Sequence, residues 1–289
     1  SQVCWLINCA APVTTQPELV MLRLSFLSLS LLLLQVINVQ AQLHRNCKLY
    51  YDSTGCKCGT YEILRHVYPW IVHMYHEDKS KECMGALINN WYVLASATCA
   101  LNSRKDTIKY FKATFQHMDR DTTETNITDV IIHPDYDPTG KFTTNELMLF
   151  KLEREIDMNN RSPACLPKQN DVLPKIKNIY VFQWKYEGKR RKFVERLDLQ
   201  KCFAEANATK PEDGDSKYIC VGGKDVDVCG TTGTLLMASF DNQLFTLYGI
   251  TSNDRVINMC KNKKIGLFTK LSPYVEWIKE NTKDAKYCK

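Results

Sequence analysis

The feature that most constrains the fold of this 289-residue chain is a series of short segments with strand-like composition. From residue 68 onwards these segments are rich in β-branched and aromatic residues, and turn-forming residues separate them. They cover residues 70–75, 84–88, 92–95, 109–115, 146–151, 179–183, 235–238, 244–251 and 267–269. The C-terminal end instead has a helical pattern, which begins at Ser272 and Pro273 and carries an apolar stripe. Regular short strands followed by one helix predict an all-β fold of two packed antiparallel barrels.

The N-terminal part has the pattern of a secretory signal. Arg23 supplies a short positive region, residues 24–34 form an apolar segment, and residues 39–41 suit signal peptidase. We therefore expect a signal peptide over residues 21–41 and a secreted, extracellular protein. The apolar run is too short to span a bilayer, so we expect no membrane partner. We interpret residues 1–20 as a leader outside the native protein, with a genuine extension of the signal as the alternative.

The chain contains 13 cysteines, and 11 remain when residues 1–41 are removed. In a secreted chain this number predicts disulfide bonds, and an odd count leaves one thiol that is free or bonded to another chain. Cys47, Cys56 and Cys58 lie in a short polar segment, which we interpret as an N-terminal tail over residues 42–67. The domain proper is then expected to cover residues 68–289.

Composition and spacing exclude two classes of partner. The net charge of +6 is too modest to indicate nucleic acid. His73 and His76 have the three-residue spacing of a helical metal site, but their segment is strand-like, so their imidazoles would face opposite sides. We expect no metal and no cofactor.

Ordered blocks over about residues 68–280 resemble the chymotrypsin/trypsin-like serine protease family. DVCGTTGTLLM, at residues 227–237, resembles the family's nucleophile loop D-x-C-x-G-D-S-G-G-P-L-M with one residue dropped after the cysteine. CMGALI at 83–88 and ASATC at 95–99 resemble C-G-G-x-L-I and T-A-A-H-C. VIIHPDY at 130–136 and NELMLFKL at 145–152 resemble I-I-H-P-x-Y and N-D-I-A-L-L-K-L. The resemblance implies two packed six-stranded antiparallel β-barrels with a C-terminal helix.

The resemblance also implies a set of disulfides. The expected pairs are Cys83–Cys99, Cys202–Cys220 and Cys229–Cys260. Cys165 is expected to bind the tail through Cys56 or Cys58, and Cys288 another tail cysteine such as Cys47. Each closed loop stabilises a secreted domain by roughly 2–4 kcal/mol.

The catalytic triad of the family is substituted at all three positions. Carried over residue by residue, the histidine becomes Thr98, the aspartate Glu146 and the serine Thr232. Glu146 keeps the charge and Thr232 keeps a hydroxyl, but an alcohol at position 98 cannot accept a proton near neutral pH. Loss of the base alone reduces the rate by about 10⁶-fold in this chemistry, or roughly 8–9 kcal/mol of barrier. We therefore predict that the chain is not an active protease.

The activation device of the family is missing as well. The segment between Cys58 and Pro69 contains no I-V-G-G, whose new amino terminus is buried in active members against the acid before the nucleophile. That acid is replaced by Thr231. Losing both ends of the pair together is physically coherent, since a buried charge without its partner is strongly unfavourable.

The binding cleft also departs from the family. Asp227 occupies the position of the carboxylate that selects Lys or Arg, while Asn253 and Asp254 replace the Trp and Gly of the family's S-W-G. Asp227 is then either a site for a basic side chain or a retained hydrogen-bonded acid, and we favour the second.

The sequence also contains a basic stretch and two glycosylation sequons. Residues 185–196 contain six cations, which we interpret as a solvated loop or, alternatively, as a site for an anionic glycan. Asn126 and Asn207 begin glycosylation sequons, which require only a surface position.

Taken together, the residues resemble a non-catalytic serine protease homologue of the kind abundant in insects. The expected role is binding and regulation in an extracellular protease cascade. The expected partners are extracellular proteins, such as active proteases or their substrates. The unpaired cysteine offers a disulfide link to such a partner. The alternatives are a serine-type endopeptidase with residual activity through Thr232 and an anionic-glycan-binding module.

Overall fold

The computed structural model describes residues 35, 56–61, 67–76, 82–100, 111–116, 122–137, 144–158, 161–173, 178–185, 188–205, 207–223, 232–239, 244–251 and 265–288. The expected leader, Cys47 and all of the expected signal peptide except residue 35 lie outside these residues. The chain divides into two compact units, Ser1–Gly55 and Cys56–Lys289, and the fold below is that of the second.

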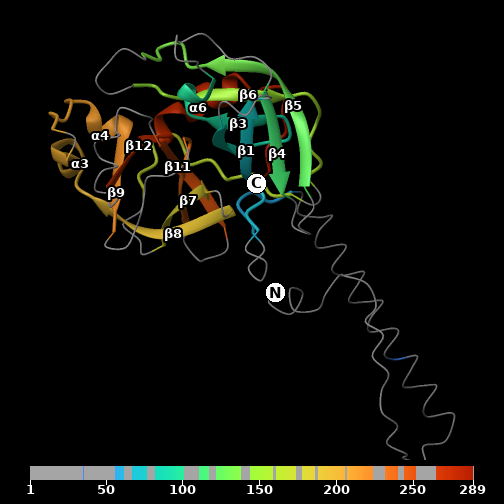
Figure 1. Ribbon diagram of the computed structural model, residues 1–289, viewed down its shortest axis with the longest axis horizontal. Coiled ribbons are helices and arrows are strands. Elements are labelled where there is room, and N and C mark those ends of the chain that lie inside the picture. The colour runs from blue at the N-terminus through green and yellow to red at the C-terminus, as the bar shows by residue number, and fades with distance from the viewer. Residues whose placement is uncertain are drawn as a thin grey trace, which may run out of the picture. The chain divides into compact units, whose positions relative to one another are not determined.

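The first barrel is closed by six antiparallel strands in the order β1-β2-β3-β6-β5-β4 (Figure 1). Its strands are β1 (Ile71–His76), β2 (Glu82–Leu87), β3 (Tyr92–Ala95), β4 (Phe111–Gln116), β5 (Thr122–Ile132) and β6 (Met148–Leu152). The interior is filled by apolar side chains that alternate along the strands, among them Val72, Met74, Phe115 and Phe150.

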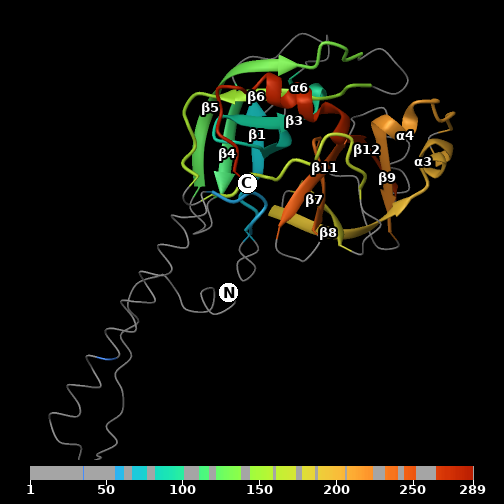
Figure 2. The same cartoon turned by 180° about the vertical axis from the view of Figure 1, so that it is seen from behind.

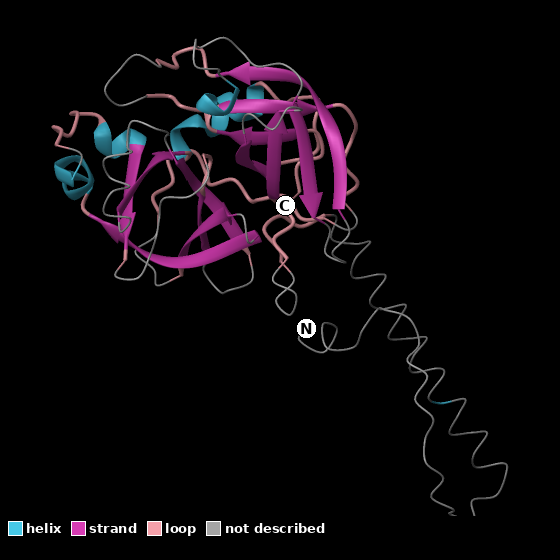
Figure 3. Cartoon of the chain, viewed as in Figure 1, coloured by secondary structure: helices cyan, strands magenta, loops and turns pink. Residues whose placement is uncertain are grey.

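The second barrel repeats this architecture in the order β10-β11-β12-β9-β8-β7. Its strands are β7 (Ile179–Lys185), β8 (Gly188–Leu197), β9 (Tyr218–Gly222), β10 (Leu235–Ser239), β11 (Phe245–Thr251) and β12 (Ile265–Lys270). Figure 3 shows how strongly strands dominate the described chain. The predicted fold of two six-stranded barrels is confirmed.

The helices of residues 56–288 that the structure describes are short and lie outside the barrels. They are the 3-10 turns η1 (Ala97–Ala100) and η3 (Ser272–Tyr274) and the helices α3 (Leu199–Glu205), α4 (Gly214–Lys217) and α6 (Val275–Glu280). The C-terminal helix was predicted, and it lies against the first barrel near β3 and β6 in both views (Figures 1 and 2). The expectation of a single helix was wrong, because α3 and α4 are too short to show a helical repeat in the sequence. No helix in the described part of the chain combines the length and the apolarity needed to cross a membrane.

Three strands escaped the sequence analysis, and each has a physical reason. β5 is mostly polar, because its side chains are largely exposed or half-buried over eleven residues. β9 is buried throughout and so lacks polar alternation. β8 contains the cations of residues 189–192, and the interpretation of this stretch as a loop was wrong: it pairs with β7 along its length, from Lys185↔Gly188 to Ile179↔Val194.

The two barrels meet in one continuous apolar core. It combines buried side chains of the first barrel, such as Trp70 and Leu149, with those of the second, such as Phe182 and Phe245. Tyr274 and Ile278, near the C-terminus, join the same cluster. Aromatic rings dominate the contact, as in the T-shaped pair of Trp70 and Phe182 at 5.9 Å.

A backbone contact joins the barrels next to this core. The amide of Met84 in β2 donates to the carbonyl of Thr232 at 2.8 Å. The following Gly233 has φ +89°, and a Cβ placed there would lie 1.8 Å from the carbonyl oxygen of Met84. Only glycine permits this close approach.

The segment of residues 56–61 is fixed to the domain by disulfides and backbone bonds. Cys58 bonds to Cys165, and Cys56 bonds to Cys288. Gly59, at φ +71°, donates to the carbonyl of Pro163 at 2.7 Å and accepts from the amide of Phe245 at 2.9 Å. The chain after α6 is also held near residue 90, because the amide of Lys286 donates to Asn90 Oδ1 at 2.7 Å.

The disulfide predictions can be compared with these bonds. Cys83–Cys99 and Cys202–Cys220 are confirmed, and so is the pairing of Cys165 with Cys58. Cys288 bonds to a cysteine of the tail, as predicted, but this cysteine is Cys56, so the suggestion of Cys47 was wrong. The pair Cys229–Cys260 lies outside the described residues.

We predict that Gly233→Ala strongly destabilises the domain. The added Cβ meets backbone atoms of Met84 and the residue is held at φ +89°, so the free energy of unfolding should fall by about 3 kcal/mol or more. Gly214→Ala is the matched control, because its neighbours are the side chains of Lys210, Leu199 and Pro211 and it should change stability by less than about 1 kcal/mol. Chemical denaturation of both variants measures the difference. Equal stability of the two would contradict the close backbone contact.

We also predict that His133 makes the domain sensitive to acid. Burial lowers the pKa of His133, its ring lies 4.8 Å from that of Trp277, and its Nδ1 accepts from the amide of Asp135 at 3.2 Å. The unfolded chain therefore binds more protons below its pKa of about 6.5, so stability is lost as the pH falls through that value towards the lower folded pKa. His133→Gln should reduce the loss of stability between pH 7 and pH 5. Identical pH dependence of the urea midpoints in the two proteins would refute this role.

Candidate functional site

The candidate site lies on the first barrel, where β3 ends and β6 begins. Thr98 lies in η1, directly after β3, and Glu146 lies just before β6. β3 and β6 pair with Ala95 opposite Met148, so the residues that flank the pair come together. The sequence positions 98 and 146 are thus neighbours in space because of strand register.

The carboxylate of Glu146 is buried and hydrogen-bonded to hydroxyl groups. Its side chain is 1% exposed. Ser96 Oγ donates to Glu146 Oε1 at 2.5 Å, and Thr98 Oγ1 donates to the same oxygen. The two hydroxyl oxygens lie 3.1 Å apart. Two of the three candidate residues, Thr98 and Glu146, therefore form one hydrogen-bonded cluster.

Ser96 belongs to this cluster and was not predicted. Its signal was present in the sequence, because it lies two residues before Thr98 in the ASATC block. The β3-to-η1 turn places residues 96 and 98 on the same side, facing one carboxylate. A buried carboxylate is stabilised by such donors, since hydrogen bonds to charged groups contribute about 1.5–3 kcal/mol each.

The turn that presents Glu146 is held by residues that the sequence analysis also missed. Asn145 has φ +56°, in the left-handed region that asparagine tolerates. Its Nδ2 donates to the carbonyl of Asp135 at 2.8 Å, and its Oδ1 accepts from the hydroxyl of Tyr274 at 2.8 Å. Burial raises the pKa of Tyr274 to about 12, so this phenol stays a donor near neutral pH.

Thr232 comes from the second barrel. It is half-buried, and it lies three residues before the start of β10. Its carbonyl accepts the amide of Met84, so the residue is fixed against β2 of the first barrel. Its hydroxyl is the group that would act as a nucleophile.

The imidazoles of two described histidines have partners of their own. His73 lies on β1, with Nε2 3.4 Å from a carboxylate oxygen of Glu82, and burial lowers the pKa of His73. His133 is held by Trp277, by Tyr274 and by the amide of Asp135. Both lowered pKa values favour the neutral ring near pH 7.

Other predicted site residues fall into two groups. Asp227, Asn253 and Asp254 lie outside the described residues. Asn126 on β5 and Asn207 after α3 are both exposed, as glycan attachment requires.

The predicted cluster of cations does not form one patch, because Arg191 and Arg196 on β8 have different neighbours. Arg191 lies over the ring of Tyr180, 4.8 Å from its centroid. Arg196 Nη1 donates to the carbonyl of Leu173 at 3.2 Å. These two cations therefore have separate environments five residues apart along β8, which does not favour one shared glycan site.

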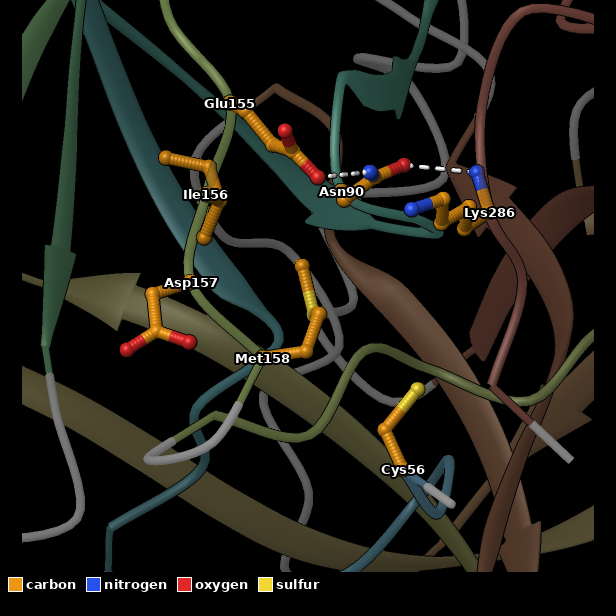
Figure 4. Close-up of a pocket in the computed structure, with 7 residues that line it drawn as sticks. All are labelled: Cys56, Asn90, Glu155, Ile156, Asp157, Met158 and Lys286. Carbon is orange, nitrogen blue, oxygen red and sulfur yellow. Dashed lines mark hydrogen bonds between the residues drawn. The ribbon is translucent and has the colours of Figure 1, made fainter.

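A cavity of about 380 Å³ lies elsewhere on the first barrel. Its lining residues are Cys56, Asn90, Glu155, Ile156, Asp157, Met158 and Lys286 (Figure 4). Asn90 bridges its rim, because Nδ2 donates to Glu155 Oε1 at 2.6 Å while Oδ1 accepts from Lys286. Neither Thr98, Glu146 nor Thr232 lines it.

Comparisons with known proteins agree on one family. The family model described as Trypsin matches residues 57–278. Phenoloxidase-activating factor 3 of Holotrichia diomphalia is 26% identical over 250 residues, which are 75% of this chain and 69% of that protein. CLIP domain-containing serine protease B10 of Anopheles gambiae is 27% identical over 250 residues, 74% of this chain and 66% of that protein. The match thus spans about two thirds of the length of these relatives.

A solved structure supports the same fold. Kallikrein-related peptidase 10, in complex with Zn²⁺, matches with a TM-score of 0.55 at 21% identity, and covers 74% of this chain and 94% of that chain. This likeness concerns the fold alone. From the match over residues 57–278 and the two closed barrels, the chain belongs to the trypsin family.

Proposed function

We propose that this chain is a secreted, catalytically inactive serine protease homologue that acts as a binding and regulatory protein in an extracellular protease cascade. The observation that carries the proposal is the hydrogen bond from Thr98 Oγ1 to the carboxylate of Glu146. An alcohol stands at the position of the general base, and its proton is directed to the neighbouring acid.

The chemistry of the site supports inactivity. A protease of this family needs a group that takes the proton of the nucleophile and returns it to the leaving amine. The hydroxyl of Thr98 cannot hold a second proton near neutral pH, and the Glu146 carboxylate accepts from both Thr98 and Ser96. Loss of the base reduces the rate by about 10⁶-fold. The hydroxyl of Thr232 is then left without activation.

The names of the relatives support a place in a protease cascade. Two of them are phenoloxidase-activating factors, and a third is a CLIP domain-containing serine protease. A rigid two-barrel fold without catalysis still offers a stable platform for loops that bind other proteins. We propose active proteases of the cascade or their substrates as the partners. The four disulfides among the described residues suit an extracellular location.

The competing function is a serine-type endopeptidase that uses Thr232 in an unconventional way. The feature in its favour is the hydroxyl that position 232 retains. The two functions differ in one observable, which is covalent reaction at that hydroxyl.

We predict no catalysis from the purified chain. Arg and Lys ester substrates should be hydrolysed no faster than in buffer, and a phosphonate inhibitor should not label the protein, because nothing activates Thr232. Mass spectrometry of the intact chain reads the label, with Thr232→Ala as the matched control. Labelling of the unmodified chain at Thr232, absent in the variant, would establish the endopeptidase instead.

We predict that Thr98 has a structural role in place of a catalytic one. Thr98→Val keeps the shape but removes a donor from the buried carboxylate, so the free energy of unfolding should fall by about 1–3 kcal/mol. Thr122→Val, at the exposed start of β5, is the control and should change stability by less than about 0.5 kcal/mol. If both variants are as stable as the unmodified protein, the hydroxyl of Thr98 does not stabilise the site.

The binding role is tested by recovering partners from the fluid into which the protein is secreted. Captured proteins are separated under non-reducing conditions and identified by mass spectrometry. We expect trypsin-like proteases or their substrates, and a band that disappears on reduction would identify a disulfide-linked partner. Recovery of neither class argues against a role in a cascade.

A further inference from the structure

Arg191 on β8 lies against the rings of three tyrosines, of which Tyr61 and Tyr180 are half-buried and Tyr68 is buried. The guanidinium carbon of Arg191 is 4.8 Å from the ring centroid of Tyr180 and 5.8 Å from those of Tyr61 and Tyr68. The tyrosines come from residues 56–61, from the start of the first barrel and from β7. The segment that contains Tyr61 lies beside β8 in both views (Figures 1 and 2).

This arginine lies at the rim of the core between the barrels. Phe182, which is directly opposite Arg191 in the β7–β8 pairing, is fully buried in that core. Tyr180 and Arg191 lie on the same side of the hairpin as Phe182 but are half-buried. The aromatic core thus continues to the surface at this point.

An exposed apolar side chain adjoins the arginine. Phe193 is 45% exposed, and its ring is 5.8 Å from that of Tyr180. It is one of three exposed large hydrophobic residues in the described part of the chain. We call Tyr61, Tyr180, Arg191 and Phe193 the Arg191 face.

The charge of this face indicates what it binds. Within the described residues no carboxylate pairs with Arg191, whose contacts are those with the tyrosine rings. A guanidinium held over aromatic rings keeps N–H donors that suit a carboxylate in a planar, two-point contact. The strand itself has five cations and one acid between residues 188 and 197, so its field favours an anionic partner.

We propose that the Arg191 face docks an acidic segment of a partner protein, which presents a carboxylate to Arg191 and an apolar side chain to Phe193. Arginine and aromatic residues together are typical of the positions that dominate protein interfaces. A protein segment can contact both the cation and the exposed ring, whereas a sulfated glycan would contact Arg191 and leave Phe193 uncovered. This inference rests on the proposed binding role and assigns that role to one surface of the fold.

The test uses the full secreted chain and a fluorescein-labelled synthetic peptide with an Asp-Phe-Glu core. An Asn-Phe-Gln peptide serves as the uncharged counterpart, and binding is followed by anisotropy at low and physiological salt. We expect the acidic peptide to bind and the uncharged one to bind at least about tenfold more weakly, as loss of a charge-assisted contact predicts. Failure of the acidic peptide to bind overturns the proposal.

Four variants locate the site. Arg191→Gln and Phe193→Ser should each weaken binding about tenfold, and Arg191→Lys should weaken it although it keeps the charge, because the planar fork is lost. Lys192→Gln is the matched control: it removes one charge from the adjacent, exposed position on the other side of β8, and should change affinity by at most about twofold. Unchanged thermal unfolding midpoints exclude misfolding.

Other occupants of the face give different results, and each contradicts the proposal. Equal loss in Arg191→Gln and Lys192→Gln would show diffuse attraction without a site. A heparin hexasaccharide that binds with dependence on Arg191 but not on Phe193 would identify a glycan surface. A dimer seen by sedimentation and lost in Phe193→Ser would identify a second copy as occupant. Hydrolysis of ester substrates is measured on the same preparations, so that the two proposals are tested separately. Hydrolysis would contradict the proposed function whether or not the peptide binds.

Discussion

The contact between the two barrels is the constraint on which the rest of the structure depends. Each barrel fills its own interior with aliphatic and aromatic side chains, yet the largest aromatic cluster lies between the barrels, around Trp70 and Phe182. Next to it the carbonyl of Thr232 accepts the amide of Met84, at a separation that only Gly233 permits. This contact fixes residues 232 and 233 against β2. It involves backbone atoms alone, so it does not depend on the side chains at positions 98, 146 and 232.

The site itself is a buried carboxylate with new partners. Glu146 needs hydrogen-bond donors wherever it is buried, because an unsatisfied charge in the interior is far more unfavourable than a paired one. Thr98 and Ser96 supply two of them from the turn after β3. The hydroxyl of Thr98 thus satisfies the buried acid. Under the proposed function, Glu146 stabilises this turn and does not orient a catalytic base.

The surface around Arg191 also bears on the proposed binding role. Arg191 was visible in the sequence only as part of a basic run, for which a solvated loop and a glycan site were the two interpretations. In the fold it lies over Tyr180 and beside Phe193, which makes it the centre of a mixed aromatic and cationic face. Strand pairing produced this result. Arg191 lies opposite Phe182 and therefore on the same side of the β7–β8 hairpin as Tyr180, whereas the adjacent Lys192 faces the other side.

The sequence by itself predicted the two-barrel fold and the family, and it named positions 98, 146 and 232 as the candidate site. The strands follow from local composition, whereas the family and the pairs Cys83–Cys99 and Cys202–Cys220 follow from the resemblance of its motifs, which needs no knowledge of distant contacts. The polar strand β5, the basic strand β8 and the pairing of Cys288 with Cys56 were decided only by tertiary structure. A strand whose side chains are mostly exposed needs no apolar repeat, so composition does not reveal it. The partner of Cys288 depends instead on which thiol the packed chain brings within reach. The role of Ser96 belongs to the same group, because a hydroxyl becomes the partner of a carboxylate 50 residues away only when β3 and β6 are paired.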